Sequence, residues 1–181
     1  MLKPDEIRKI LEKGTKALNV EFSEDVISDI VKYSNCLATI AHQLAYNLCF
    51  NAGIKITGEK CVKLDAEQLP SAIDDFTVEK QDTYKNTYYA ITKHRESKFK
   101  NVEIILETLC IIDKPEVLMH ELFDEILKVH PDYPQGNLSA YIKRLTSTDY
   151  EEVLRNNAGR LSFSDPFFGA YVKMKFREKK S

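Results

Sequence analysis

Histidines are the side chains of this chain best suited to metal binding or acid–base chemistry. His42 lies inside the apolar stretch of residues 36–52, and His120 follows Glu116 and precedes Asp124 at intervals of four residues. That interval puts side chains on one face of a helix, where paired metal ligands must lie. No further ligand motif accompanies these residues, so we expect no metal site.

Cysteine and serine side chains are the next candidates, as nucleophiles. None of the cysteines belongs to a Cys-x-x-Cys pair, and a free thiol within an apolar pattern packs as a small hydrophobic group. The serines precede predicted helices and do not occur in a Gly-x-Ser-x-Gly turn. The chain is therefore not expected to be an enzyme by itself. The cysteines expected to be structural are Cys36, Cys49, Cys61 and Cys110.

The composition is that of an ordinary globular protein, with 43% hydrophobic and 30% charged residues and a net charge of −2. No apolar run reaches the roughly 20 residues that a membrane-spanning helix needs. The first residues also lack the apolar core of a signal peptide. We therefore expect a cytoplasmic chain with no membrane partner. The net charge does not favour nucleic acid as a partner of the chain as a whole.

Helical periodicity dominates the first half of the chain. Residues 54–64 alternate instead and are predicted to be a short extended piece or a loop. The polar, charged run from residue 94 to 101 predicts a boundary, so we divide the chain into residues 1–98 and 99–181. The helices expected before this boundary span residues 4–18, 23–34, 36–52, 65–73 and 79–94, and Gly14 is a point where the first of them could be interrupted.

The second half has the element order of a winged helix-turn-helix. Asn137 is expected to cap its third helix, and an Asn-Asn-Ala-Gly turn predicts a hairpin. Asp165-Pro166 then starts a closing helix, which we expect to pack its aromatic side chains onto a neighbour. The fold class is therefore predicted to be mainly α: a helical bundle followed by a winged helix with one small β-hairpin. The expected elements are helices at 99–112, at 116–129 after an Asp113 cap, and at 137–147, with a hairpin at 151–164.

A winged helix binds DNA by placing its third helix in the major groove and its wing over a phosphate strand. In that arrangement Ser139, Lys143 and Arg144 face outward on the third helix, and Arg155 and Arg160 flank the wing. These are the candidate nucleic-acid contacts. Because the positive charge is sparse, a winged helix that contacts protein is the alternative, and it is slightly favoured.

The stretch of residues 22–53 resembles the lid subdomain of AAA+-type ATPases, in the bacterial and archaeal groups related to the STAND and Orc-like NTPases. In that pattern a helix ending in Ser-Asn is followed by Gly-Leu-Pro and then by a long helix with a His-x-Leu element. The sequence "FSDPFFGAYVKMKF" is similar to the end of the winged-helix domain of those proteins. The lid residues that match are Ser34, Asn35, Leu37, His42 and Leu44, while Cys36 and Ala38 replace the glycine and the proline.

The resemblance implies that residues 1–98 are a lid-like helical domain and residues 99–181 a winged-helix domain. The chain holds neither a P-loop, G-x-x-x-x-G-K-[ST], nor a Walker B carboxylate pair. It would then be a non-catalytic regulatory or coupling module without a cofactor of its own, whose parent ATPase binds ATP and Mg²⁺. Its partners would be that ATPase core and either DNA or a protein. His42 would sense the nucleotide, or it would only pack beside Tyr46 on its helix.

A stand-alone winged-helix DNA-binding regulator is the second hypothesis. Residues 1–98 would then serve as a dimerisation or sensor domain. A P-loop domain encoded directly before residue 1 would favour the first hypothesis over this one.

Overall fold

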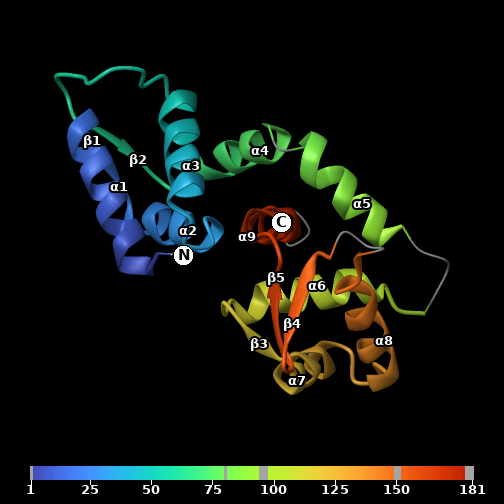
Figure 1. Cartoon of the computed structure of the whole chain (residues 1–181). Coiled ribbons are helices and arrows are strands. Elements are labelled where there is room, and N and C mark those ends of the chain that lie inside the picture. Colours follow the sequence, from blue (N-terminus) through green and yellow to red (C-terminus); the bar gives the residue numbers. More distant parts are fainter. Residues whose placement is uncertain (1, 80, 94–97, 149–151, 178–181) are drawn as a thin grey trace. The chain divides into compact units, whose positions relative to one another are not determined.

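The computed structural model describes residues 2–79, 81–93, 98–148 and 152–177, and most of them are helical (Figure 1). Contacts divide the chain into two compact units, residues 1–80 and 81–181. We call them unit 1 and unit 2 and describe each by itself. The predicted mainly α fold class is confirmed. Within the described ranges, every helix is too short or too polar to cross a membrane.

Unit 1 is built from helices and one pair of short strands. Its first helix begins at Pro4, a residue suited to a first helical turn, and the Glu6 carboxylate accepts a hydrogen bond from the Lys3 N–H. The Ser23 hydroxyl caps the second helix by accepting from the Val26 N–H, as predicted. The elements are α1 (Pro4–Leu18), β1 (Val20–Phe22), α2 (Glu24–Tyr33), α3 (Ala38–Asn51), β2 (Val62–Leu64) and α4 (Leu69–Glu79).

β1 and β2 form a parallel pair that the sequence did not predict. Val20 lies opposite Val62. Asn19 ends α1 in the left-handed conformation, and its side-chain amide donates hydrogen bonds to the carbonyls of Gly58 and Glu59. The loop before β2 is thereby held against the end of α1. Of the extended piece expected at residues 54–64, only the end is a strand.

The core of unit 1 lies where its helices meet. α3 contributes the residues predicted for its inner face, since Ile40, Ala41, Leu44 and Leu48 are buried, while Leu37 is half-buried at the start of the helix. The other helices add buried side chains of the same kind: Ile7, Leu11, Val26, Ile30, Leu69 and Phe76.

Unit 2 begins with a short π-helical turn, η1 (Gln81–Lys85), and combines helices with a three-stranded sheet. The strands lie in the order β3-β5-β4, and both pairings are antiparallel. The remaining elements are α5 (Asn86–Thr92), α6 (Asn101–Ile112), β3 (Val117–Leu118), α7 (Met119–Val129), α8 (Gln135–Leu145), β4 (Leu154–Asn157), β5 (Arg160–Phe163) and α9 (Pro166–Arg177).

The predicted hairpin is present as β4 and β5, and its turn is tight. Ala158 and Gly159 have φ angles of 51° and 83°, and positive φ at both central residues is the conformation of a type I′ turn. The Asn156 side-chain oxygen accepts a hydrogen bond from the Gly159 N–H at 2.9 Å. The turn therefore keeps the two strands in register.

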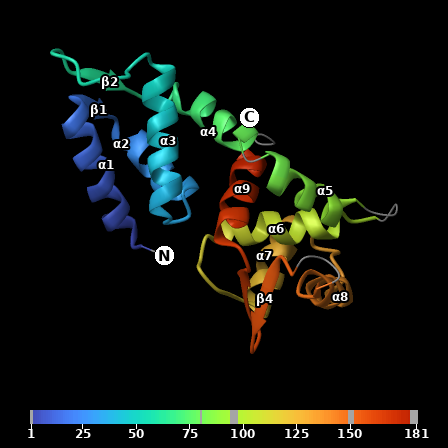
Figure 2. The same cartoon turned by 45° about the horizontal axis from the view of Figure 1, so that its top comes forward.

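The closing helix α9 packs its aromatic side chains into the core of unit 2, as predicted. Phe168, Tyr171 and Phe176 are buried there, and α9 lies against α6 (Figure 2). The Asp165 carboxylate caps the helix by accepting a hydrogen bond from the Phe167 N–H at 2.8 Å. The stretch "SDPFF" thus follows the end of β5 and contains the helix cap and the start of a core helix.

The unit boundary differs from the predicted one. Tyr88 and Ile91 of α5 belong to the buried core of unit 2, so the compact unit starts at residue 81 and not at residue 99. Because the aromatic stripe of α5 has the same helical spacing whichever unit it joins, periodicity could not assign it. Residues 94–97 of the expected boundary lie outside the described residues.

Two predicted helix starts in unit 2 are wrong. Asp113 is the left-handed residue that ends α6, not a cap for the next helix. Val117 and Leu118 pair with β5, so α7 begins only at Met119. α8 starts after Pro134, which leaves Asn137 inside its first turn instead of at its cap.

Candidate nucleic-acid interface and apolar groove

α8 presents one face to the core and the other to solvent. Leu138, Ile142 and Leu145 are buried, as their spacing predicted. Ser139 and Lys143 are exposed on the opposite side. Both side chains are therefore accessible to a partner that lies along α8.

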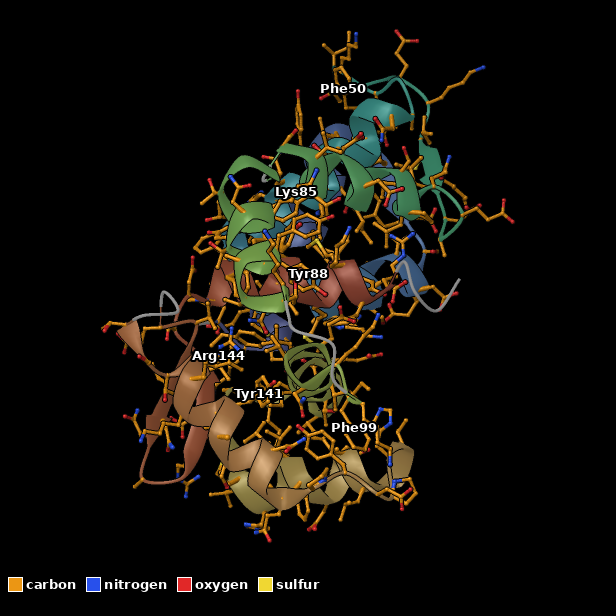
Figure 3. All side chains as sticks on the ribbon, turned by 90° about the vertical axis from the view of Figure 1, so that its right-hand side faces the viewer. Phe50, Lys85, Tyr88, Phe99, Tyr141 and Arg144 are labelled. Carbon is orange, nitrogen blue, oxygen red and sulfur yellow. The ribbon has the colours of Figure 1, made fainter. Side chains whose placement is uncertain are left out.

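Arg144 does not share the full exposure expected for the outer face of α8. It is half-buried, and its guanidinium carbon lies 5.8 Å from the centre of the Tyr141 ring (Figure 3). A cation over an aromatic face is attracted by the ring's electrons. The Arg144 guanidinium is therefore held against the Tyr141 ring of the same helix. Lys143 is the more accessible of the two cations.

The hairpin carries Arg155 and Arg160 on one face. Arg155 lies opposite Ser162 and Arg160 opposite Asn157, whereas the buried Leu161 lies opposite Asn156. Because side chains alternate along a strand, the two arginines point away from the Leu161 side. Both are exposed. The hairpin thus presents two cations together to solvent.

Charge is distributed unevenly over the elements of unit 2. α8 and the β4–β5 hairpin contain Lys143, Arg144, Arg155 and Arg160 but no Asp or Glu. The segment from α6 to α7 is rich in carboxylates: Glu103, Glu107, Asp113, Glu116, Glu121, Asp124 and Glu125. The elements that a winged helix would direct at DNA therefore carry positive charge only, although other elements of unit 2 also contain lysines.

Partly buried polar contacts hold α9 against η1 and α6. The Tyr84 hydroxyl donates a hydrogen bond to the Asp165 carboxylate at 3.0 Å. Burial, followed by this hydrogen bond and the negative charge of Asp165, raises the pKa of Tyr84 to about 12. On α9 the buried Lys173 ammonium pairs with the Asp113 carboxylate at the end of α6. A buried ammonium needs such a partner, since an unpaired charge in the interior is costly.

His42 lies in unit 1, exposed on α3 at the edge of an apolar groove. The groove has a volume of about 400 Å³ and runs between α1 and α3, with Val20 and Phe22 of β1 among its lining. Tyr46, one turn after His42, also lines it, so the two side chains share a helix face as predicted. The groove contains no phosphate-binding loop, and the nucleotide-sensing role of His42 stays a prediction.

The far end of the groove is formed by aromatic and cationic side chains. Tyr46 and Phe50 stack with ring centres 5.9 Å apart, and they are 61% and 48% exposed. Lys55 places its ammonium 5.1 Å from the centre of the Phe50 ring. Figure 3 shows Phe50 at the C-terminal end of α3.

The remaining histidines and cysteines form no reactive cluster among the residues that the structure describes. No three His, Cys, Asp or Glu side chains there lie close enough together to hold a metal ion, and His94 falls outside those residues. Burial raises the pKa of the Cys49 thiol, which lines the groove, and that of Cys110 to about 12. Both thiols are therefore neutral near pH 7 and act as packing groups.

Comparison with known proteins gives no relative. No family model matches the chain, and neither a curated protein nor a solved structure is significantly similar to it. Function must therefore be argued from the two surfaces themselves.

The groove is the feature that sequence reasoning missed. His42 was singled out for its resemblance to a lid helix, whereas its neighbours Tyr46 and Phe50 were assigned no function. Their spacing of four residues was a usable signal, because aromatic side chains there continue the stripe of His42 on a face away from Leu44 and Leu48. What the sequence could not give was the wall opposite them.

Proposed function

We propose that unit 2 is a winged-helix module that binds duplex DNA. α8 would lie in the major groove and the β4–β5 hairpin would follow a phosphate strand. The observation that carries the proposal is the charge of these two elements: four cations and no carboxylate, in a chain with a net charge of −2. Arg155 and Arg160, exposed on one face of the hairpin, supply its phosphate contacts.

Binding by so few cations is expected to be weak and dependent on salt. Each phosphate contact releases counterions and adds about 0.9 to the slope of log K against log salt. Lys143, Arg155 and Arg160 would contribute contacts directly, and Arg144 would do so only if it left the Tyr141 ring. Ser139 would add a hydrogen bond near the start of α8 without changing the slope.

Fluorescence anisotropy with a labelled duplex of about 20 base pairs, titrated at several salt concentrations, tests the proposal. Replacement of Arg155 and Arg160 by alanine should lower the slope by about 2 and weaken binding at low salt. Both side chains are exposed, so the thermal unfolding midpoint should change only as little as it does for surface substitutions in general.

The control variant removes the same charge from the carboxylate-rich side of unit 2. Lys114 pairs with Glu121 and Lys128 with Glu125, and both lysines are exposed. Alanine at Lys114 and Lys128 should leave the salt slope unchanged. If the two double variants weaken binding equally, or if the native chain binds no duplex at low salt, the DNA role fails and contact with a protein becomes the better account of α8 and the hairpin.

The interpretation of the chain as a coupling module of an AAA+-type ATPase is a further proposal, and it is supported only by the resemblance of residues 22–53 and of the sequence "FSDPFFGAYVKMKF". It predicts a P-loop domain encoded directly upstream. Without that domain, the stand-alone DNA-binding regulator in the cytoplasm is the version of the proposal that remains.

A further inference from the structure

A glycine in the middle of α1 opens the apolar groove of unit 1. Gly14 lines the groove, and a Cβ built on it would meet no atom within 4 Å. Its φ angle is not positive, so the backbone does not require glycine there. Glycine inside a helix is destabilising relative to alanine. Gly14 therefore makes α1 less stable than alanine would, and it leaves open space in the groove beside the α1 backbone.

The polar side chains of the groove favour an anionic ligand. His42 and Lys55 are side chains in its lining able to donate hydrogen bonds, besides Tyr46 and Cys49, and no carboxylate lines it. The Thr15 hydroxyl, also in the lining, donates to the Glu12 carbonyl at 3.1 Å. Among the residues that the structure describes, no carboxylate forms an ion pair with Lys55, whose ammonium lies over the Phe50 ring. An anion at this end of the groove would meet a positive charge that no carboxylate of the described residues neutralises.

The volume of the groove and its aromatic lining indicate the uncharged part of the ligand. The groove volume of about 400 Å³ lies within the range of pockets that bind small organic molecules. The stacked rings of Tyr46 and Phe50 form one wall and remain about half exposed. An aromatic ring can stack against such a wall and cover it.

We propose that this groove binds a small organic carboxylate with an aromatic body. The ring lies between Gly14 of α1 and the Tyr46–Phe50 pair of α3, and the carboxylate lies at Lys55. This site is separate from the nucleic-acid interface of unit 2 and does not depend on it.

Titration calorimetry of the full chain with 1-naphthaleneacetate tests the proposal, with 1-naphthaleneacetamide as a neutral ligand of the same shape. The carboxylate should bind with a Kd of about 1 mM or tighter, as usual ligand efficiency gives for about 14 non-hydrogen atoms. The amide should bind about threefold more weakly, because the contact with the exposed Lys55 is screened by solvent. Amide shifts in a nitrogen–proton spectrum should be concentrated in α1 and in α3 around Tyr46 and Phe50.

Two substitutions at Gly14 distinguish an effect on binding caused by filling the groove from one caused by stabilising α1. Gly14→Leu fills the open space and should abolish binding, whereas Gly14→Ala improves the helix equally well and should change Kd by less than about twofold. Ala45→Leu narrows the groove from the α3 side and provides a second blocking variant if Gly14→Leu fails to fold. Both blocking variants should retain the duplex binding of the native chain.

Lys55→Gln should reduce the affinity for the carboxylate to that for the amide, while Lys9→Gln, on α1 outside the lining, should leave both unchanged. The expected Kd is about 1 mM, so binding should be detectable at a ligand concentration of about 1 mM. The proposal is overturned if the native chain does not bind the carboxylate at that concentration. It is equally overturned if Gly14→Leu and Ala45→Leu bind as tightly as the native chain, or if acid and amide bind alike.

Discussion

In unit 1 the aromatic side chains of α3 line an open groove, whereas in unit 2 those of α9 are buried. Tyr46 and Phe50 are 61% and 48% exposed, while Phe168 and Tyr171 are each 2% exposed. The covering in unit 2 comes from other elements, since Tyr84 of η1 lies against both rings of α9 and Phe163 of β5 against Phe168. The comparison teaches that helical spacing of aromatic residues predicts a helix but does not tell whether another element covers it.

Glycines in the helices of the two units also differ in whether another element packs against them. Gly169 of α9 allows a close approach, because a Cβ there would lie 2.8 Å from a ring carbon of Phe163. Gly14 of α1 faces open space. One glycine lets a helix pack against a strand, and the other keeps a groove open.

The largest expected difference between the units follows from truncating one phenylalanine in each. Phe168→Ala removes a ring from the core of unit 2 and should lower the free energy of unfolding by about 4 kcal/mol. Phe50→Ala removes a half-exposed ring and should cost about 1 kcal/mol or less. Urea unfolding, followed by helical circular dichroism, measures both. Equal losses would contradict the assignment of Phe50 to an open groove.

Helix propensity and steric contact act in opposite directions at the two glycines. Gly14→Ala should stabilise the chain by up to about 1 kcal/mol, because alanine is the better helix former and its methyl group meets no atom. Gly169→Ala gains the same propensity, but its methyl group forces the Phe163 ring aside, so we expect a net loss of about 1–2 kcal/mol. Thermal unfolding midpoints should therefore move in opposite directions. A rise in both would mean that Phe163 yields without cost.

The elements set by local signals were predicted from the sequence. The Pro4 start and the Asn19 end of α1 agree with the predicted helix at residues 4–18, and Asn-Asn-Ala-Gly gave the β4–β5 hairpin. What was missed depends on residues distant in sequence. β1 is a strand because Val62 pairs with Val20 across the whole of α2 and α3, and β3 is one because Leu161 pairs with Val117. No pattern within three residues can report such a partner.

The candidate site divides in the same way. Ser139, Lys143, Arg155 and Arg160 are exposed as their positions on a helix and a hairpin predicted, because alternation and helical period fix the outward face locally. Arg144 is half-buried, with its guanidinium over the Tyr141 ring. The spacing of three residues allows this contact on a helix, but the prediction considered only the outward face and did not use it. The apolar groove is lined by residues of α1, β1 and α3 that are far apart in the sequence, so it depends on tertiary packing.

The last prediction concerns pH and applies to unit 2. Burial, the hydrogen bond to Asp165 and the charge of Asp165 raise the pKa of Tyr84 to about 12, while burial and the neighbouring Tyr141 raise that of Tyr133 to about 12. An unfolded tyrosine titrates near pH 10. Between these values the unfolded chain has released protons that the folded chain retains, so the free energy of unfolding falls as pH rises. The stabilisation is complete below pH 10 and is lost as pH passes through about 12.

Tyr84→Phe isolates the contribution of one hydroxyl. The variant should lose about 1 kcal/mol at pH 8, since the hydrogen bond to Asp165 is missing. Its stability should then fall less steeply than that of the native chain between pH 10 and 11.5, by at most about one proton in the linkage slope. Native-state hydrogen exchange shows whether the effect lies in unit 2. As pH rises, the amides of α9 should lose more protection from exchange in the native chain than in the Tyr84→Phe variant. If the slopes of the two proteins are equal, the folded chain does not hold the Tyr84 proton more tightly than the unfolded chain, and the raised pKa of Tyr84 is contradicted.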